Sequence, residues 1–342
     1  MVKEELLAFG ALLLMYICSF AVGKEASIIA GFVLGVYLVF RASELAVEGL
    51  DKLALKIGIS KHLAGVISSI ASILPETLIA LFLIMKASAE TIETAVLSTI
   101  IAAGLNVFLL GVFILILGSK KGAIKVSYTA IEHESELIRS TIVVCFLITL
   151  MGLVEDCEGY LPQGIGIFLL LVYAAYIINM VSKTPLKKSL EKEVSSRKIA
   201  LLIALGFGGV IVGSKLVSDL GEYAVHTLNL SPALAALILA IFGTIPENGI
   251  AIIGALKGHL ELGLANLLAG ITQCILIVLG IVALFTPIPL DGYIVFQLAS
   301  VAGVLWLVNK AILDDNQLTL EEGVFIVLLQ TLVLVLFEEL RI

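Results

Sequence analysis

The sequence predicts an all-α polytopic membrane protein with eleven transmembrane helices, arranged as one extra N-terminal helix and two inverted five-helix repeats. Three observations predict this class. Hydrophobic residues make up 60% of the chain and charged residues only 14%. Apolar stretches of about 20 residues, the length that spans a bilayer as a helix, recur along the whole chain. The two halves of the chain are also similar to each other in sequence.

The composition excludes an ordinary soluble enzyme. A soluble domain carries about 25% charged residues, and the mean hydropathy of this chain is +1.14. The net charge of −7 argues against nucleic acid as a partner. The four cysteines are scattered and form no CxxC pair, so neither a disulfide framework nor a structural zinc site is indicated. We expect the lipid bilayer and transported cations as partners, and no cofactor; the composition gives no oligomeric state.

Eleven apolar stretches are candidate spans, and they lie near residues 6–22, 27–50, 62–84, 93–117, 139–154, 161–181, 199–221, 232–256, 262–286, 290–309 and 322–338. The first stretch is the extra N-terminal helix, within residues 1–26. A cleaved signal peptide is its alternative interpretation, although Lys3, Glu4 and Glu5 give a mixed-charge start and no small-residue cleavage site follows.

The basic residues give the orientation of the spans. The loops are numbered from the N-terminal tail as loop zero. Even-numbered loops then hold 16 of the 21 Lys and Arg residues, and odd-numbered loops hold Lys24, Lys86 and Arg341. Cytoplasmic loops collect Lys and Arg, so the N-terminus is predicted inside and the C-terminus outside. The short loops are typical of a prokaryotic cytoplasmic membrane protein.

The strongest internal signal is a repeat at a constant offset of 171 residues without a gap. It places Pro75-Glu76 on Pro246-Glu247 and Ser43 on Ser214. The predicted repeats are residues 27–181 and 199–342, joined by a cytoplasmic linker over 182–198. Each repeat has five spans, so the second enters the membrane from the opposite side. Inverted repeats place a binding site near the bilayer midplane, at their interface.

The repeat centres carry the candidate chemistry. Glu76 and Glu247 each follow a proline in the middle of a predicted span. A carboxylate at that depth costs roughly 2.5–3.5 kcal/mol, which favours a functional role. Proline also disturbs the preceding helical turn and frees carbonyl oxygens near Ser72 and Gly243. Carboxylates, carbonyls and hydroxyls suit a hard cation. The alternative is a pair of proline kinks with protonated, hydrogen-bonded glutamates.

These motifs resemble a known family. Residues 42–49 (ASELAVEG), residues 55–60 (LKIGIS) and Pro75-Glu76 are similar to the first repeat of the Ca²⁺/cation antiporter superfamily, which includes sodium/calcium and proton/calcium exchangers. The second repeat is matched by residues 230–232 (LSP), 243–247 (GTIPE), 255–258 (ALKG) and 276–280 (LIVLG). The resemblance implies export of Ca²⁺ by alternating access, driven by entry of Na⁺ or H⁺. It also implies that Glu76 and Glu247 are the central ion-binding carboxylates, and that Ser72 and Thr244 supply further oxygens.

The chain departs from the family pattern in the next span of each repeat, as expected of a divergent member. Many members carry a Ser there and an Asn or Asp four residues later, and the corresponding positions are Thr99, Ala103, Gly270 and Cys274. Nearby polar residues that could substitute are Ser98, Asn106, Asn266, Thr272 and Gln273. The candidate cation ligands are therefore Glu76, Glu247, Ser72, Thr244, Thr99, Gly243 and Gln273. The loss of oxygens favours exchange of one divalent ion against protons over a site for several Na⁺.

Two other functions are alternatives to a divalent-cation antiporter. A channel or uniporter with the same acidic centre would pass ions without a counter-gradient. An intramembrane enzyme is disfavoured, because the sequence has no HExxH, GxSxG or P-loop motif. The sequence does not separate Na⁺ from H⁺ coupling, or Ca²⁺ from Mn²⁺ or Mg²⁺.

Charged residues at the span ends have structural interpretations. Arg41 with Glu44, and Lys215 with Asp219, have the spacing of ion pairs along one helix. Lys86 is expected to cap the end of its helix.

Overall fold

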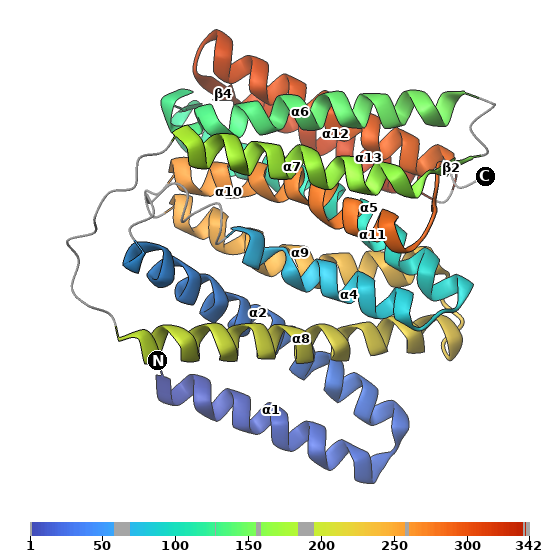
Figure 1. Cartoon of the computed structure of the whole chain (residues 1–342). Coiled ribbons are helices and arrows are strands. Elements are labelled where there is room, and N and C mark those ends of the chain that lie inside the picture. Colours follow the sequence, from blue (N-terminus) through green and yellow to red (C-terminus); the bar gives the residue numbers. More distant parts are fainter. Residues whose placement is uncertain are drawn as a thin grey trace. The chain divides into compact units, whose positions relative to one another are not determined.

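A computed structural model describes residues 2–57, 69–126, 128–154, 159–183, 195–256, 260–337 and 339. The chain forms two compact units. Unit 1 comprises residues 1–98 and 184–243, and unit 2 comprises residues 99–183 and 244–342. Each unit therefore contains segments from both halves of the sequence. The divisions fall inside two helices, α5 (Ala89–Lys121) and α9 (Pro232–Leu256), whose course is labelled in Figure 1.

Every secondary-structure element that the structure describes in unit 1 is a helix. Its complete helices are α1 (Val2–Val22), α2 (Lys24–Lys56), α4 (Leu74–Met85) and α8 (Ser196–His226), and it also holds the first turns of α5 and α9. Helices α1 and α4 pack against α2 and α8 respectively.

The close pairing of α2 with α8 depends on small residues. A Cβ atom added to Gly213 of α8 would lie 2.8 Å from the carbonyl oxygen of Gly35 and 2.9 Å from the nitrogen of Val39, both on α2. Added at Gly206, it would lie within 2.7 Å of the Ala46 Cα atom. Contacts of this kind between backbones are typical of helices that associate in a bilayer, where small residues let the helices approach.

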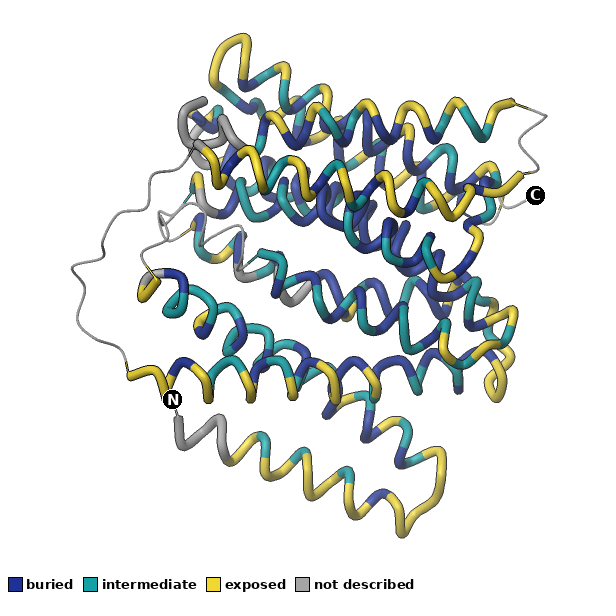
Figure 2. The backbone as a smooth tube through the Cα atoms, in the orientation of Figure 1, coloured by how far each residue is buried: buried dark blue, intermediate teal, exposed yellow. Residues whose placement is uncertain are grey.

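Unit 2 holds the remaining helices and four short strands. The helices are the rest of α5 and α9, α6 (Tyr128–Leu153), α7 (Gln163–Lys183), α10 (Leu260–Gln273), the π-helix η1 (Cys274–Val278), α11 (Leu279–Phe285), α12 (Gly292–Asp314) and α13 (Leu320–Val335). Helix α6 packs against α12, and α7 against α11. The segment from α10 to α11 is largely buried, whereas much of α7 is exposed, as the burial colours of Figure 2 show.

The strands were not part of the predicted all-helical chain. Strand β1 (Ala123–Lys125) pairs with β4 (Gln317–Thr319), and β2 (Tyr160–Leu161) pairs with β3 (Ile288–Pro289), both antiparallel. Each pair joins two connections between helices and buries one apolar side chain from each strand, for example Ile124 opposite Leu318. A two- or three-residue pair of this kind leaves no periodic signal in the sequence.

The predicted helical spans agree with the observed helices. Each of the eleven apolar ranges falls on a helix or on consecutive helices, with the range 62–84 described only from residue 69 onward. Within the described residues, seven helices are long and apolar enough to cross a membrane. Most of the linker predicted over 182–198 lies outside the described residues.

Candidate functional site

The first repeat centre is an interrupted helix in unit 1. Residues 69–72 are helical, Ile73 forms a turn, and α4 begins at Leu74 with Pro75 in its first turn. Proline fits this position because it needs no hydrogen-bond donor there. The carbonyl oxygen of Ile73 accepts two hydrogen bonds from Thr77, at 3.1 Å from its backbone N–H and 3.0 Å from its hydroxyl. The break predicted from Pro75 is present, and it places Glu76 in the first turn of the new helix.

Two serines contribute to this region. The hydroxyl of Ser72, a predicted ligand, donates to the carbonyl oxygen of Ser69 at 2.7 Å. The fully buried hydroxyl of Ser214 donates to the carbonyl oxygen of Pro75 over 3.4 Å. Sequence reasoning did not assign Ser214 to the site, although the repeat aligns it with Ser43. Helix α8 therefore contributes a polar group beside Pro75-Glu76.

Gly243 lies against the first repeat centre. A Cβ atom added to Gly243 would lie 3.4 Å from the Cγ atom of Glu76. Gly243 belongs to α9 and precedes Glu247 by one helical turn. Unit 1 therefore brings together three predicted ligand positions, namely Ser72, Glu76 and Gly243.

The second repeat centre is an unbroken helix. Helix α9 continues through Pro246, so the interruption expected there from proline is absent. A proline removes one helical hydrogen bond, and Asn248 adds a side-chain bond in the same turn by donating to the Thr244 carbonyl oxygen at 2.9 Å. This contact repeats the Thr77–Ile73 contact at an offset of 171 residues. Glu247 lies in this turn, and its side chain is outside the described part of the chain.

The other predicted ligands in unit 2 are buried. Thr99 and Thr244 have almost no exposed surface. The side-chain N–H of Gln273 donates to the hydroxyl of Tyr173 on α7 at 3.1 Å. Unit 2 thus holds the predicted positions Thr99, Thr244, Glu247 and Gln273. Within the described residues, no three or more His, Cys, Asp or Glu side chains form a metal-binding group.

A π-helix follows the last of these positions. The N–H of Leu279 donates to the carbonyl oxygen of Cys274, five residues earlier. Such insertions are frequent at functional sites and rotate the residues after them relative to those before. The corresponding residues of the first repeat, 103–107, lie in uninterrupted α5. The two repeats therefore differ in helix register at the position where the sequence also departs from the family pattern.

Comparison with known proteins identifies the family. The sequence profile of the family described as "Sodium/calcium exchanger protein" matches residues 27–181 and 198–337. The chain belongs to this family. It is therefore an integral membrane protein of the Ca²⁺/cation antiporter superfamily, a group of transporters. No curated protein matches the chain by sequence.

Solved structures agree on the fold of this exchanger. The H⁺/Ca²⁺ exchanger CAX is similar with a TM-score of 0.74 and 18% identity, over 97% of this chain and 88% of that chain. The sodium-calcium exchanger NCX_Mj, soaked with 100 mM Na⁺ and 10 mM Sr²⁺, gives a TM-score of 0.62 and 20% identity over 92% and 99% of the two chains. The same protein soaked with 2.5 mM Na⁺ and 0.1 mM Ca²⁺ gives the same values. At these identities the likeness concerns the fold.

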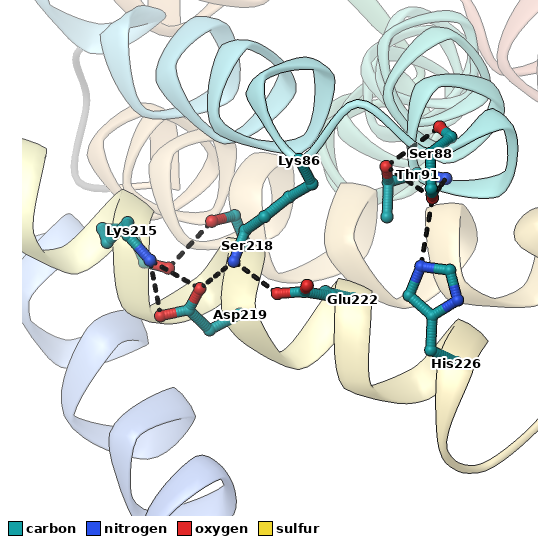
Figure 3. A network of polar contacts seen from close by, with 8 residues as sticks. All are labelled: Lys86, Ser88, Thr91, Lys215, Ser218, Asp219, Glu222 and His226. Carbon is teal, nitrogen blue, oxygen red and sulfur yellow. Dashed lines mark hydrogen bonds and ion pairs between the residues drawn. The ribbon is translucent and has the colours of Figure 1, made fainter.

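A charged network in unit 1 of the exchanger connects the α4–α5 turn to α8 (Figure 3). The ammonium group of Lys86 forms ion pairs with Asp219, at 2.6 Å, and with Glu222. Lys215 also pairs with Asp219, at 2.7 Å. The predicted pairs Lys215–Asp219 and Arg41–Glu44 are confirmed.

The same network adds to the role expected of Lys86. Lys86 is the C-cap residue of α4, as expected, and its side chain also forms ion pairs with carboxylates of α8. Close by, Ser88 is 3.0 Å from both the Thr91 hydroxyl and the Nε2 atom of His226. The prediction missed these contacts because the two segments are more than 130 residues apart in sequence.

Proposed function

We propose that this exchanger carries Ca²⁺, or a related divalent cation, against Na⁺ or H⁺ by alternating access, with Glu76 and Glu247 binding the same ion. The observation that carries the proposal is the closeness of Glu76 to Gly243, which lies one turn before Glu247 on α9. A Cβ atom added to Gly243 would lie 3.4 Å from the Cγ atom of Glu76. A residue of the second repeat, four positions before Glu247, therefore lies beside the glutamate of the first repeat. The printed functions of the structurally similar proteins, H⁺/Ca²⁺ and sodium–calcium exchange, agree with this cargo.

The proposed chemistry follows from two carboxylates, each in an apolar span. Two ionised glutamates carry two negative charges, which cost several kcal/mol in the bilayer unless cations balance them. One divalent cation, two Na⁺ ions or two protons restore neutrality. Binding of any one of these loads to the two glutamates excludes the others. The binding site can change its access from one side of the membrane to the other without uncompensated charge only when one of these loads is bound. Competition for Glu76 and Glu247 therefore couples export of one ion to import of another.

Neutral oxygens complete the proposed site. Ser72 lies four residues before Glu76, on the other side of the break at Ile73, and Thr244 lies in the same turn as Glu247. A hydroxyl that donates to a carbonyl retains lone pairs for a cation. Thr99, Gln273 and the carbonyl oxygen of Gly243 are further candidate ligands. Ca²⁺ takes six to eight oxygen ligands in variable geometry, which a mixed set of carboxylates, hydroxyls and carbonyls supplies.

The orientation of the chain is part of the proposal. The bias of basic residues supports a cytoplasmic N-terminus and an external C-terminus in a prokaryotic cytoplasmic membrane. Single cysteines at Lys3 and Glu339, introduced in a chain whose four native cysteines are replaced and probed in intact cells, test it. A thiol reagent that does not cross membranes is expected to label position 339 and not position 3; the reverse pattern would overturn the orientation.

Flux measurements test the exchange itself. The purified protein is placed in proteoliposomes, and Ca²⁺ uptake is measured under an imposed outward Na⁺ gradient and, separately, an outward H⁺ gradient. We expect uptake with one of the two gradients, which names the counter-ion. Uptake that is equally fast without either gradient would contradict antiport and identify a channel or uniporter. If Ca²⁺ is taken up under neither gradient, and Mn²⁺ and Mg²⁺ are not taken up either, the result would contradict a divalent cargo.

A further inference from the structure

Asn106 joins three helical segments inside unit 2. It lies on α5 and has 2% of its surface exposed. Its side-chain oxygen accepts a hydrogen bond from the Asn248 amide on α9 at 2.6 Å. Its own N–H group donates to the sulfur of Cys274, where η1 begins, at 3.3 Å. Buried amides in an apolar span are held by such bonds, because an unpaired amide there is costly.

The opposite helix leaves space for this amide. A Cβ atom added to Gly270 of α10 would lie 3.4 Å from the side-chain oxygen of Asn106 and 3.5 Å from its Cγ atom. The Asn106 carboxamide therefore packs against the backbone of α10 at Gly270. In this part of unit 2, α10 contributes a bare backbone at Gly270, η1 contributes a thiol at Cys274, and α5 contributes the polar group between them.

The contact with Asn248 leads to the second repeat centre. Asn248 directly follows Glu247, and its amide also donates to the Thr244 carbonyl oxygen at 2.9 Å. One amide therefore connects Asn106 to both ends of the turn 244–248. In the first repeat the matching residue is Thr77, whose hydroxyl makes the bond to the carbonyl four residues earlier. Asparagine at 248 makes that bond and also reaches a second helix.

We propose that Asn106 is a positioning residue for the transported cation, which acts by fixing Asn248 and thereby the turn that carries Glu247. The inference rests on the proposed function, since it depends on Glu247 as an ion ligand. Because an amide is neutral, Asn106 can fix this geometry without adding to the charge that the cargo must balance. Its loss is expected to weaken cation binding more than it slows the turnover of the loaded protein.

A double-mutant cycle tests the inference in proteoliposomes. The KM for Ca²⁺ is measured for Asn106→Ala, for Asn248→Thr and for the double variant. Asn248→Thr copies the first repeat and keeps the bond within α9, so it is expected to fold. Each single change should raise KM about tenfold, the effect of one buried hydrogen bond, with kcat little changed. The double variant should match the singles, because both act through one contact.

A second buried amide pair provides the matched control. Gln330 donates to the side-chain oxygen of Gln297 at 2.9 Å, also inside unit 2. Gln330→Ala should lower the melting temperature about as much as Asn106→Ala, and leave KM unchanged. An unchanged KM in Asn106→Ala and Asn248→Thr, or increases that multiply in the double variant, would overturn the role of Asn106. That result leaves the proposed function intact if Glu247→Gln still loses transport. Full transport in Glu247→Gln would refute the proposed function itself.

Discussion

The ammonium nitrogen of Lys86 lies 2.6 Å from a carboxylate oxygen of Asp219, a residue 133 positions later in the chain. This contact, with the second one to Glu222, fixes the turn after α4 to α8. Burial alone would lower the pKa of Lys86, but the hydrogen bonds and charges of Asp219 and Glu222 outweigh it, so the pKa lies above its usual value of 10.5. The network therefore favours a charged Lys86.

Replacing Lys86 is expected to weaken unit 1. Lys86→Met should lower stability by about 1 kcal/mol, between the values typical of exposed and buried pairs. Lys215→Met is the matched control, because it removes only a pair within α8, and its effect should be smaller. Thermal unfolding in detergent measures both, and an equal loss in the two variants would contradict a connecting role for Lys86.

The stability difference between the wild type and Lys86→Met should depend on pH. The pKa of Lys86 is raised in the folded protein, so its contribution to stability is complete below pH 10.5 and is lost as the pH rises through the folded-state value. The difference in melting temperature between the wild type and Lys86→Met should be constant from neutral pH to about pH 10 and shrink above it. A difference that already shrinks between pH 7 and pH 9 would show that another group is responsible.

The α2–α8 pair is expected to be sensitive to added volume. Gly213→Ala places a methyl group 2.8 Å from the Gly35 carbonyl oxygen, and a backbone contact of this kind cannot be relieved by a side-chain rotation. We expect a loss of about 1–3 kcal/mol, the usual cost of overpacking. Gly208→Ala, also on α8, meets no atom within 4 Å. Thermal unfolding should separate the two variants, and equal melting temperatures would contradict the close approach.

A fourth prediction concerns the Gln297–Gln330 pair. A Cβ atom at Gly104 of α5 would lie 2.8 Å from both polar atoms of Gln297, so Gly104→Ala must displace the amide pair. Its loss should cost about 1 kcal/mol, the scale of polar contacts between membrane helices. Gly303→Ala on α12 meets nothing within 4 Å and should be neutral or stabilising. A neutral Gly104→Ala would mean that the pair contributes nothing to stability.

The sequence was most informative where a feature is local or repeated. Apolar length alone located the helices, and Pro75 predicted the break before Glu76, because both effects act within a few residues. The ion pair of Arg41 with Glu44 followed from spacing on one helix. Repetition at a fixed offset separated Glu76 and Glu247 from other charged residues, since chance seldom duplicates a Pro-Glu pair in an apolar span.

Contacts between distant segments were not predictable in this way. Nothing near Lys86 in sequence indicates that it pairs with Asp219 and Glu222. In the sequence, Asn106 is one of several polar residues that could contribute to the site, and only the packing of α5 with α9 and α10 distinguishes it from the others. Pro246 shows that a local sequence pattern can also predict a feature that the structure lacks. The same dipeptide that accompanies a break in the first repeat lies in a continuous helix in the second, so the dipeptide alone does not decide whether the helix is interrupted.

The central claim is that Glu76 and Glu247 hold one cation between them. The most direct measurement is Ca²⁺ uptake into proteoliposomes by Glu76→Gln, Glu247→Gln and, as a control, Glu321→Gln, whose side chain is exposed at the start of α13. The account predicts that each of the first two loses about 100-fold in uptake at low Ca²⁺, as expected when a buried charge loses its partner, and that Glu321→Gln transports normally. Near-normal uptake by either Glu76→Gln or Glu247→Gln would contradict it.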